Sequence, residues 1–74
     1  MTFKEQLQLD IIPRIKDMVD KEESYWHWLN YECSAVDDAH HDFLVSAISK
    51  SEKYLAHYKQ RLQEYIDYAE KLEA

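Results

Sequence analysis

Apolar residues in the second half of the chain recur at helical spacing over a long distance. From Leu44 onward they follow one another in steps of four and three residues as far as Leu72. The apolar members of this stripe are Leu44, Ile48, Leu55, Tyr58, Leu62, Tyr65, Ala69 and Leu72, and Ser51 is its polar member. Such heptad spacing is typical of a helix that packs along a neighbouring helix. We therefore predict one long C-terminal helix over roughly residues 36–73.

A second stripe of the same kind occupies the first half of the chain. Its members are Phe3, Leu7, Ile11, Ile15 and Met18. Thr2 and Glu5 have the spacing of a capping box, in which each side chain bonds the free backbone N–H of the other residue. Pro13 interrupts this stripe, because proline lacks an N–H and its ring clashes with the carbonyl four residues earlier. We predict a helix over roughly residues 2–32 that is kinked or broken near Pro13.

The two stripes predict an all-α fold in which residues 1–74 form a single helical domain. The chain contains no glycine, the usual residue of β-hairpin turns, and one proline. A turn at roughly residues 33–36 would let the two helices pair as an antiparallel helical hairpin. Folding the chain about residue 36 brings Glu22 beside Ser51, Leu29 beside Leu44 and Met18 beside Leu55. A polar layer such as Glu22–Ser51 can fix the register of paired helices at some cost in stability.

Apolar residues also lie outside these stripes, which a single hairpin cannot bury. Trp26 and Trp28 point in well-separated directions, because successive helical residues are about 100° apart. A helix that is apolar most of the way round is buried most of the way round. We therefore expect a homodimer that forms a four-helix bundle. The residues expected at this oligomer interface are Ile12, Val19, Trp26, Tyr54, Ile66 and Tyr68. The alternative is a compact three-helix monomer, with the first helix split near Asp20–Glu23.

Charge is distributed unevenly along the chain, whose formal net charge is −6. Residues 22–49 contain six acidic side chains and no Lys or Arg, together with both tryptophans, and the two flanking segments are balanced. Aromatic residues with depleted lysine are typical of protein interfaces. The residues predicted to bind a partner are Glu22, Glu23, Trp26, Trp28, Tyr31, Glu32, Asp37, Asp38 and Asp42. We expect a protein partner with a basic surface and no direct contact with nucleic acid, which requires Lys and Arg.

Histidine, cysteine and carboxylate side chains around the predicted turn are weak candidates for a metal site. These candidates are His27, Glu32, Cys33, His40 and His41. Zinc uses these ligand types, but the Glu-x-x-His motif of bundle metal sites is absent. Cys33 is surrounded in sequence by acids, whereas a reactive thiolate needs nearby positive charge. We therefore expect no cofactor and no enzymatic activity.

A cytoplasmic protein is expected, because a lone cysteine fits a reducing compartment and no apolar stretch approaches the length of a signal peptide core or membrane span. The leading functional hypothesis is a non-enzymatic protein–protein interaction module, an acidic inhibitor or adaptor that engages a basic surface. Small acidic helical inhibitors of phages and mobile elements act in this way, an analogy of size and charge. The alternatives are a structural, self-assembling helical scaffolding unit and a metal-binding protein that uses histidines and carboxylates.

Overall fold

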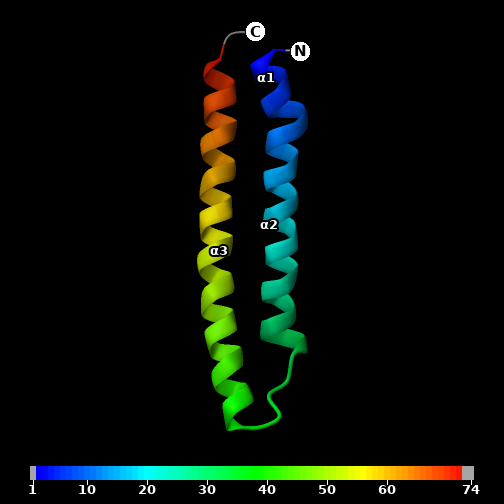
Figure 1. Cartoon of the computed structure of the whole chain (residues 1–74), viewed down its shortest axis with the longest axis vertical. Coiled ribbons are helices and arrows are strands. Elements are labelled where there is room, and N and C mark those ends of the chain that lie inside the picture. Colours follow the sequence, from blue (N-terminus) through cyan, green and yellow to red (C-terminus); the bar gives the residue numbers. More distant parts are fainter. Residues whose placement is uncertain (1, 73–74) are drawn as a thin grey trace.

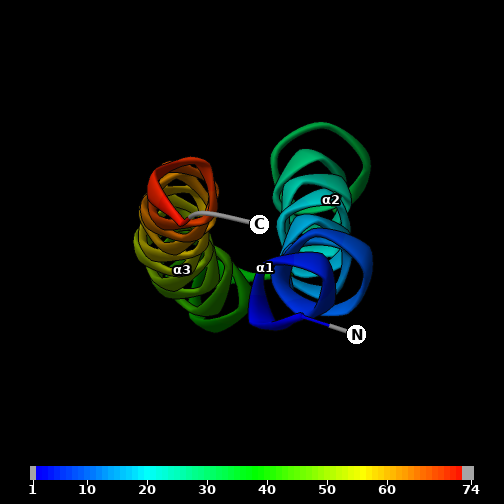
Figure 2. The ribbon, with the colours of Figure 1, turned by 90° about the horizontal axis from the view of Figure 1, so that it is seen from above.

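The structure is a computed structural model that describes residues 2–72, and within this range it is helical and contains no strand. The first arm consists of α1 (Phe3–Gln6), the π-helical turn η1 (Leu7–Ile11), α2 (Ile12–His27) and the π-helical turn η2 (Trp28–Glu32). The second arm is the single helix α3 (Asp38–Lys71). The arms lie side by side and run in opposite directions (Figures 1 and 2), forming a rod of 56 × 15 × 13 Å. The predicted all-α fold with a long second helix is confirmed.

The first arm continues through the region where the three-helix alternative required a break. α2 runs without interruption from Ile12 to His27 and so includes Asp20–Glu23. The three-helix alternative is therefore wrong for the described residues. None of the helices in residues 2–72 is both long enough and apolar enough to cross a bilayer.

Pro13 is accommodated by a wider turn instead of a break. It is the second residue of α2, and α2 directly follows η1. At the end of η1 the backbone N–H of Ile12 donates to the carbonyl of Leu7, five residues earlier. A π turn holds about one residue more than an α turn. This extra residue lies where the proline ring would otherwise collide with a preceding carbonyl. The helix therefore continues past Pro13. The residues after η1 are rotated about the helix axis, as they would be if one residue had been inserted into a regular α-helix.

This shift changes which residues of the first arm face α3. Val19 is only 6% exposed, whereas Met18 is 44% exposed. The regular stripe placed Met18 in the seam between the arms and Val19 at an interface with a second copy. The structure reverses these positions, since Val19 belongs to the seam of a single chain. The buried apolar residues of the described chain are Leu7, Val19, Leu29, Leu44 and Ala69.

A buried polar layer crosses the middle of the seam. Ser51 is 1% exposed, and its hydroxyl donates to Oε1 of Glu22 at 2.8 Å. Among the described residues, each buried side-chain nitrogen or oxygen has a hydrogen-bond partner. The predicted register is confirmed at this layer, where Glu22 lies beside Ser51.

Residues 33–37 connect the arms, and α3 begins slightly later than the pattern predicted. Asp37 is its N-cap, because Oδ1 accepts the backbone N–H of His40 at 2.7 Å. In return, Nδ1 of the His40 ring accepts the backbone N–H of Val36 at 3.0 Å. These two bonds fix the chain where it enters α3. The helix ends at Lys71, and residue 73, where its end was predicted, lies outside the described residues.

Candidate interaction surfaces

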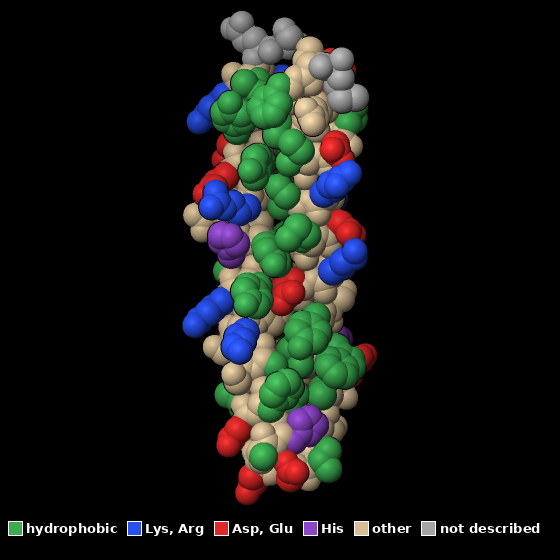
Figure 3. All heavy atoms as spheres, viewed as in Figure 1, with side chains coloured by type: hydrophobic (Ala, Val, Ile, Leu, Met, Phe, Trp, Pro, Cys, Tyr) green, Lys and Arg blue, Asp and Glu red, His purple; other side chains and the backbone are tan. Residues whose placement is uncertain are grey.

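Exposed aromatic side chains gather along one side of the seam. Tyr25 from α2 and Phe43 and Tyr54 from α3 line one groove between the arms. Trp28 stacks on Tyr25 with ring centroids 6.2 Å apart, and Phe3 meets Tyr68 edge to face at 6.4 Å. Tyr54 and Tyr68 are two heptads apart and so share this side of α3. We call this surface the aromatic face, and its residues are Phe3, Tyr25, Trp28, Phe43, Tyr54 and Tyr68, all exposed. Figure 3 shows hydrophobic side chains along this side of the rod.

The opposite side of the seam is bridged by polar contacts between the arms. Nε1 of Trp26 donates to Oε1 of Glu52 at 3.3 Å, and Nζ of Lys59 lies 4.0 Å from Oε2 of Glu23. These four residues line a second groove together with Leu55 and Ala56. We call this side the bridged face. It offers less apolar surface, because Trp26 and Leu55 are half-buried.

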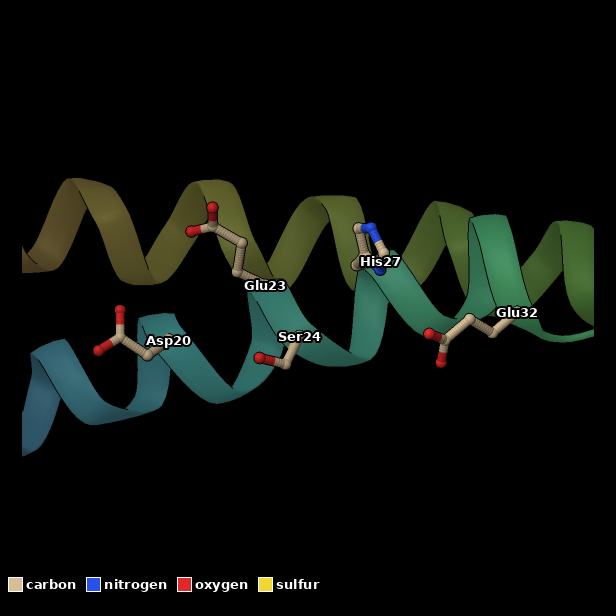
Figure 4. A pocket seen from close by; sticks show the side chains of 5 residues that line it. All are labelled: Asp20, Glu23, Ser24, His27 and Glu32. Carbon is tan, nitrogen blue, oxygen red and sulfur yellow. The ribbon is translucent and has the colours of Figure 1, made fainter.

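The loop end of the first arm carries an exposed aromatic group beside acids. Tyr31 is 70% exposed, and its ring lies 4.8 Å from the ring of His27 and 6.3 Å, edge to face, from that of Trp26, measured between centroids. His27 also lines an open hollow on the outer side of the first arm. The other residues of this hollow are Asp20, Glu23, Ser24 and Glu32 (Figure 4). We call Trp26, His27, Tyr31 and the acids of the hollow the acidic end.

The residues predicted to bind a partner are divided by the structure. Glu22 is bonded within the seam and Asp37 caps α3, so both have structural roles. Trp28 lies on the aromatic face. Glu23, Trp26, Tyr31 and Glu32 come together at the acidic end. Asp38 and Asp42 are exposed on the first turns of α3.

The residues predicted to form an oligomer interface also separate. Tyr54 and Tyr68 lie on the aromatic face, whereas Trp26 lies on the bridged face. Ile12 and Ile66 lie on the side of the bridged face, because each is two heptads from a residue of that groove, Trp26 and Glu52 respectively. One flat interface therefore cannot contain the whole set.

Three residues of the aromatic face were missed by the sequence reasoning. Phe3 was assigned to the stripe of the first arm, and neither Tyr25 nor Phe43 was placed in the partner-binding set or the oligomer set. The available signal was the place of Phe43, next to Leu44, which puts an aromatic ring at the edge of the stripe.

The weak metal candidates do not form a site. In the range 2–72, no three His, Cys, Asp or Glu side chains gather in a way that could hold a metal ion. His40 is engaged by the connection through Val36 and Asp37, and Cys33 is a half-buried free thiol. His27 and Glu32 line the hollow on the first arm, without Cys33, His40 or His41.

Comparison of the chain with protein-family models, with curated proteins and with solved structures finds no match.

Proposed function

We propose that this protein is a non-enzymatic protein–protein interaction module whose acidic end engages a basic surface on a partner protein. The observation that carries this proposal is the exposure of Tyr31 beside Trp26 and His27, next to the acidic hollow. The segment from Glu22 to Ser49 contains no Lys or Arg, and among the described residues Glu23 is the one acid of the hollow with a basic partner, Lys59 at 4.0 Å.

This combination suits a basic partner for two physical reasons. Arginine pairs with carboxylates through its planar fork of donors and also stacks on aromatic faces. A cation over a Tyr or Trp ring gains further attraction from the ring electrons. An Arg or Lys side chain that entered the hollow would meet Glu23 and Glu32 with Tyr31 nearby. An acidic inhibitor or adaptor would use the surface in this way.

In this proposal the chain is an antiparallel helical hairpin that works as a homodimer. The support is the small core, since a narrow pair of helices leaves the six residues of the aromatic face exposed. A self-assembling scaffolding unit is the second candidate function, and it rests on the same aromatic face without any role for the acidic end.

Charge reversal at the acidic end tests the proposal. Asp20→Lys/Glu32→Lys changes two exposed acids of the hollow and preserves the Asp37 cap and the Glu22–Ser51 bond. The matched control, Asp67→Lys/Glu70→Lys, makes the same change in net charge on the last turns of α3. The solution mass of both variants is measured first.

Proteins captured from a cell extract on the wild-type chain are then purified and titrated against all three proteins. We expect the double change at the acidic end to raise the Kd of the captured partner by on the order of tenfold at low salt, with little change for the control. A Tyr31→Ala variant, which keeps the charge, should also weaken binding. Equal Kd values for the wild type and Asp20→Lys/Glu32→Lys would refute a charge-directed role for this end.

A further inference from the structure

The exposed surface of one chain is larger than its mass predicts. The chain exposes 5735 Å². A compact protein of 9.0 kDa is expected to expose about 4,900 Å². The excess is close to the roughly 800 Å² that each partner buries in a standard protein interface. A single further contact of ordinary size would therefore bring this chain to the burial of a compact protein.

The aromatic face is the surface best suited to this contact. Its six aromatic side chains are exposed along the length of the rod. On the bridged face, in contrast, the Trp26–Glu52 hydrogen bond and the Glu23–Lys59 pair already span the arms. Covering that face would remove these polar groups from water, which costs free energy.

Charge decides the direction in which a second copy lies on this face. The acidic segment 22–49 occupies the loop end of the rod, whereas both flanking segments are balanced. On the side shown in Figure 3, acidic side chains gather at the loop end, whereas farther up both edges carry Lys and Arg side chains together with Asp and Glu. A parallel dimer would bring two acidic ends together. An antiparallel dimer separates them and lays each over the balanced flanking segments of the other copy, where Lys and Arg side chains are present.

We infer that two copies of this chain pack aromatic face to aromatic face in antiparallel orientation, about a twofold axis near Met18 and Tyr54. These residues lie near the middle of the two arms. The axis brings α3 against α3, with Phe43 of one copy at the level of Tyr68 of the other. It also places Glu32 at the level of Lys4 of the second copy. The inference rests on the self-association in the proposed function and is independent of any partner of the acidic end.

This arrangement has a consequence for the acidic end. The Trp28 side chain becomes part of the dimer, whereas Trp26 and Tyr31 stay accessible. The dimer then presents two acidic ends at opposite tips of one rod, so that it can hold two basic partners at once.

The native thiol of Cys33 provides a direct measurement of orientation. Cys33 is the one cysteine of the chain and lies at the loop end. A nitroxide label on Cys33 is followed by double electron–electron resonance. In the antiparallel dimer the two labels are about 45 Å apart, twice the helical rise between Met18 and Cys33. In a parallel dimer both labels lie at the same tip, within about 20 Å, a spacing of two neighbouring helix diameters.

Matched variants on α3 test the face. Tyr54 is 52% exposed on the aromatic face, and Val45 is 54% exposed and lies one heptad before Glu52 of the bridged face. By sedimentation, Tyr54→Glu should reduce the mass from the dimer to one chain, whereas Tyr54→Phe and Val45→Glu should keep the dimer. Circular dichroism records whether each variant remains helical.

The possible outcomes are distinct. A distance near 45 Å together with dissociation by Tyr54→Glu alone supports the inference. A short distance overturns the orientation, dissociation by Val45→Glu alone overturns the face, and a wild-type chain that sediments with the mass of one copy overturns the dimer itself. Because the Cys33 measurement uses the unaltered chain, it remains decisive if Tyr54→Glu fails to fold. Loss of partner binding in Asp20→Lys/Glu32→Lys with an intact dimer would bear on the acidic end alone.

Discussion

The Glu22–Ser51 layer offers the sharpest test of how the two arms are held in register. In the Ser51→Ala variant the hydroxyl that donates to Glu22 at 2.8 Å is lost. A hydrogen bond to a charged group contributes roughly 1.5–3 kcal/mol. Glu22 is only half-buried, so its carboxylate can recover some contact with water. We therefore expect the free energy of unfolding to fall by about 1–2 kcal/mol. For a domain of this size this corresponds to a decrease in Tm of roughly 4–8 °C per kcal/mol.

The matched control is Ser49→Ala, because Ser49 is exposed on the same helix. Alanine is the better helix former, so this control should be neutral or stabilising by a few tenths of a kcal/mol, about 0.5 at most. Urea unfolding of both variants is followed by circular dichroism at one fixed protein concentration, since self-association changes apparent stability. If the two variants unfold at the same urea concentration, the layer contributes nothing and the reasoning fails.

Replacing both members of the layer distinguishes the contribution of the hydrogen bond to stability from that of packing. In Glu22→Leu/Ser51→Ala no polar group is left without a partner, and such exchanges are often neutral or stabilising. We expect the double variant to have a free energy of unfolding at least as large as that of the wild type. Ser51→Ala alone, in contrast, is expected to be less stable. A double variant that is less stable than Ser51→Ala would show that the layer acts through packing and not through the hydrogen bond.

Three further changes follow from the burial and bonding of single side chains. Asp37→Ala removes the N-cap of α3 and should lower the free energy of unfolding by about 1 kcal/mol in urea titration; no loss would show that the connection is held by other contacts. Leu44→Ala in the seam should cost about 2–4 kcal/mol. The same change at exposed Val45 should cost less than about 0.5 kcal/mol, and equal costs would contradict the observed facing of α3. Lys59→Ala should change stability by less than about 0.5 kcal/mol, because its exposed pair with Glu23 spans 4.0 Å; a larger loss would indicate that this pair is worth more than its geometry implies.

The proposed dimer would reconcile the two candidate functions. An antiparallel pair would use the aromatic face for self-association and leave the acidic ends free, so scaffolding and partner binding would not compete for the same side chains. Trp28 and Trp26 would then report on different events. Changes at Trp28 would affect the mass in solution, whereas changes at Trp26 would affect binding to a basic partner.

Apolar spacing was sufficient to predict the class of fold and much of the seam. The steps of four and three from Leu44 to Leu72 predicted the long helix, because a helix buries one stripe and the stripe is visible in the sequence. The alignment of Glu22 with Ser51 was also predictable, since the connection is short and each arm rises by the same amount per residue.

Only the tertiary structure decided which neighbours of the stripe face inward. A regular helix from Leu7 would bury Met18, but the π turn before Pro13 adds a residue and brings Val19 into the seam instead. A spacing rule with one fixed helical period cannot predict this turn, because the π turn adds one residue to the helix at a single place. The division of Trp26 and Trp28 between opposite faces likewise depends on which side of the first arm α3 covers. The sequence thus determined that two amphipathic helices pair, and the packing between them determined which side chains remain outside.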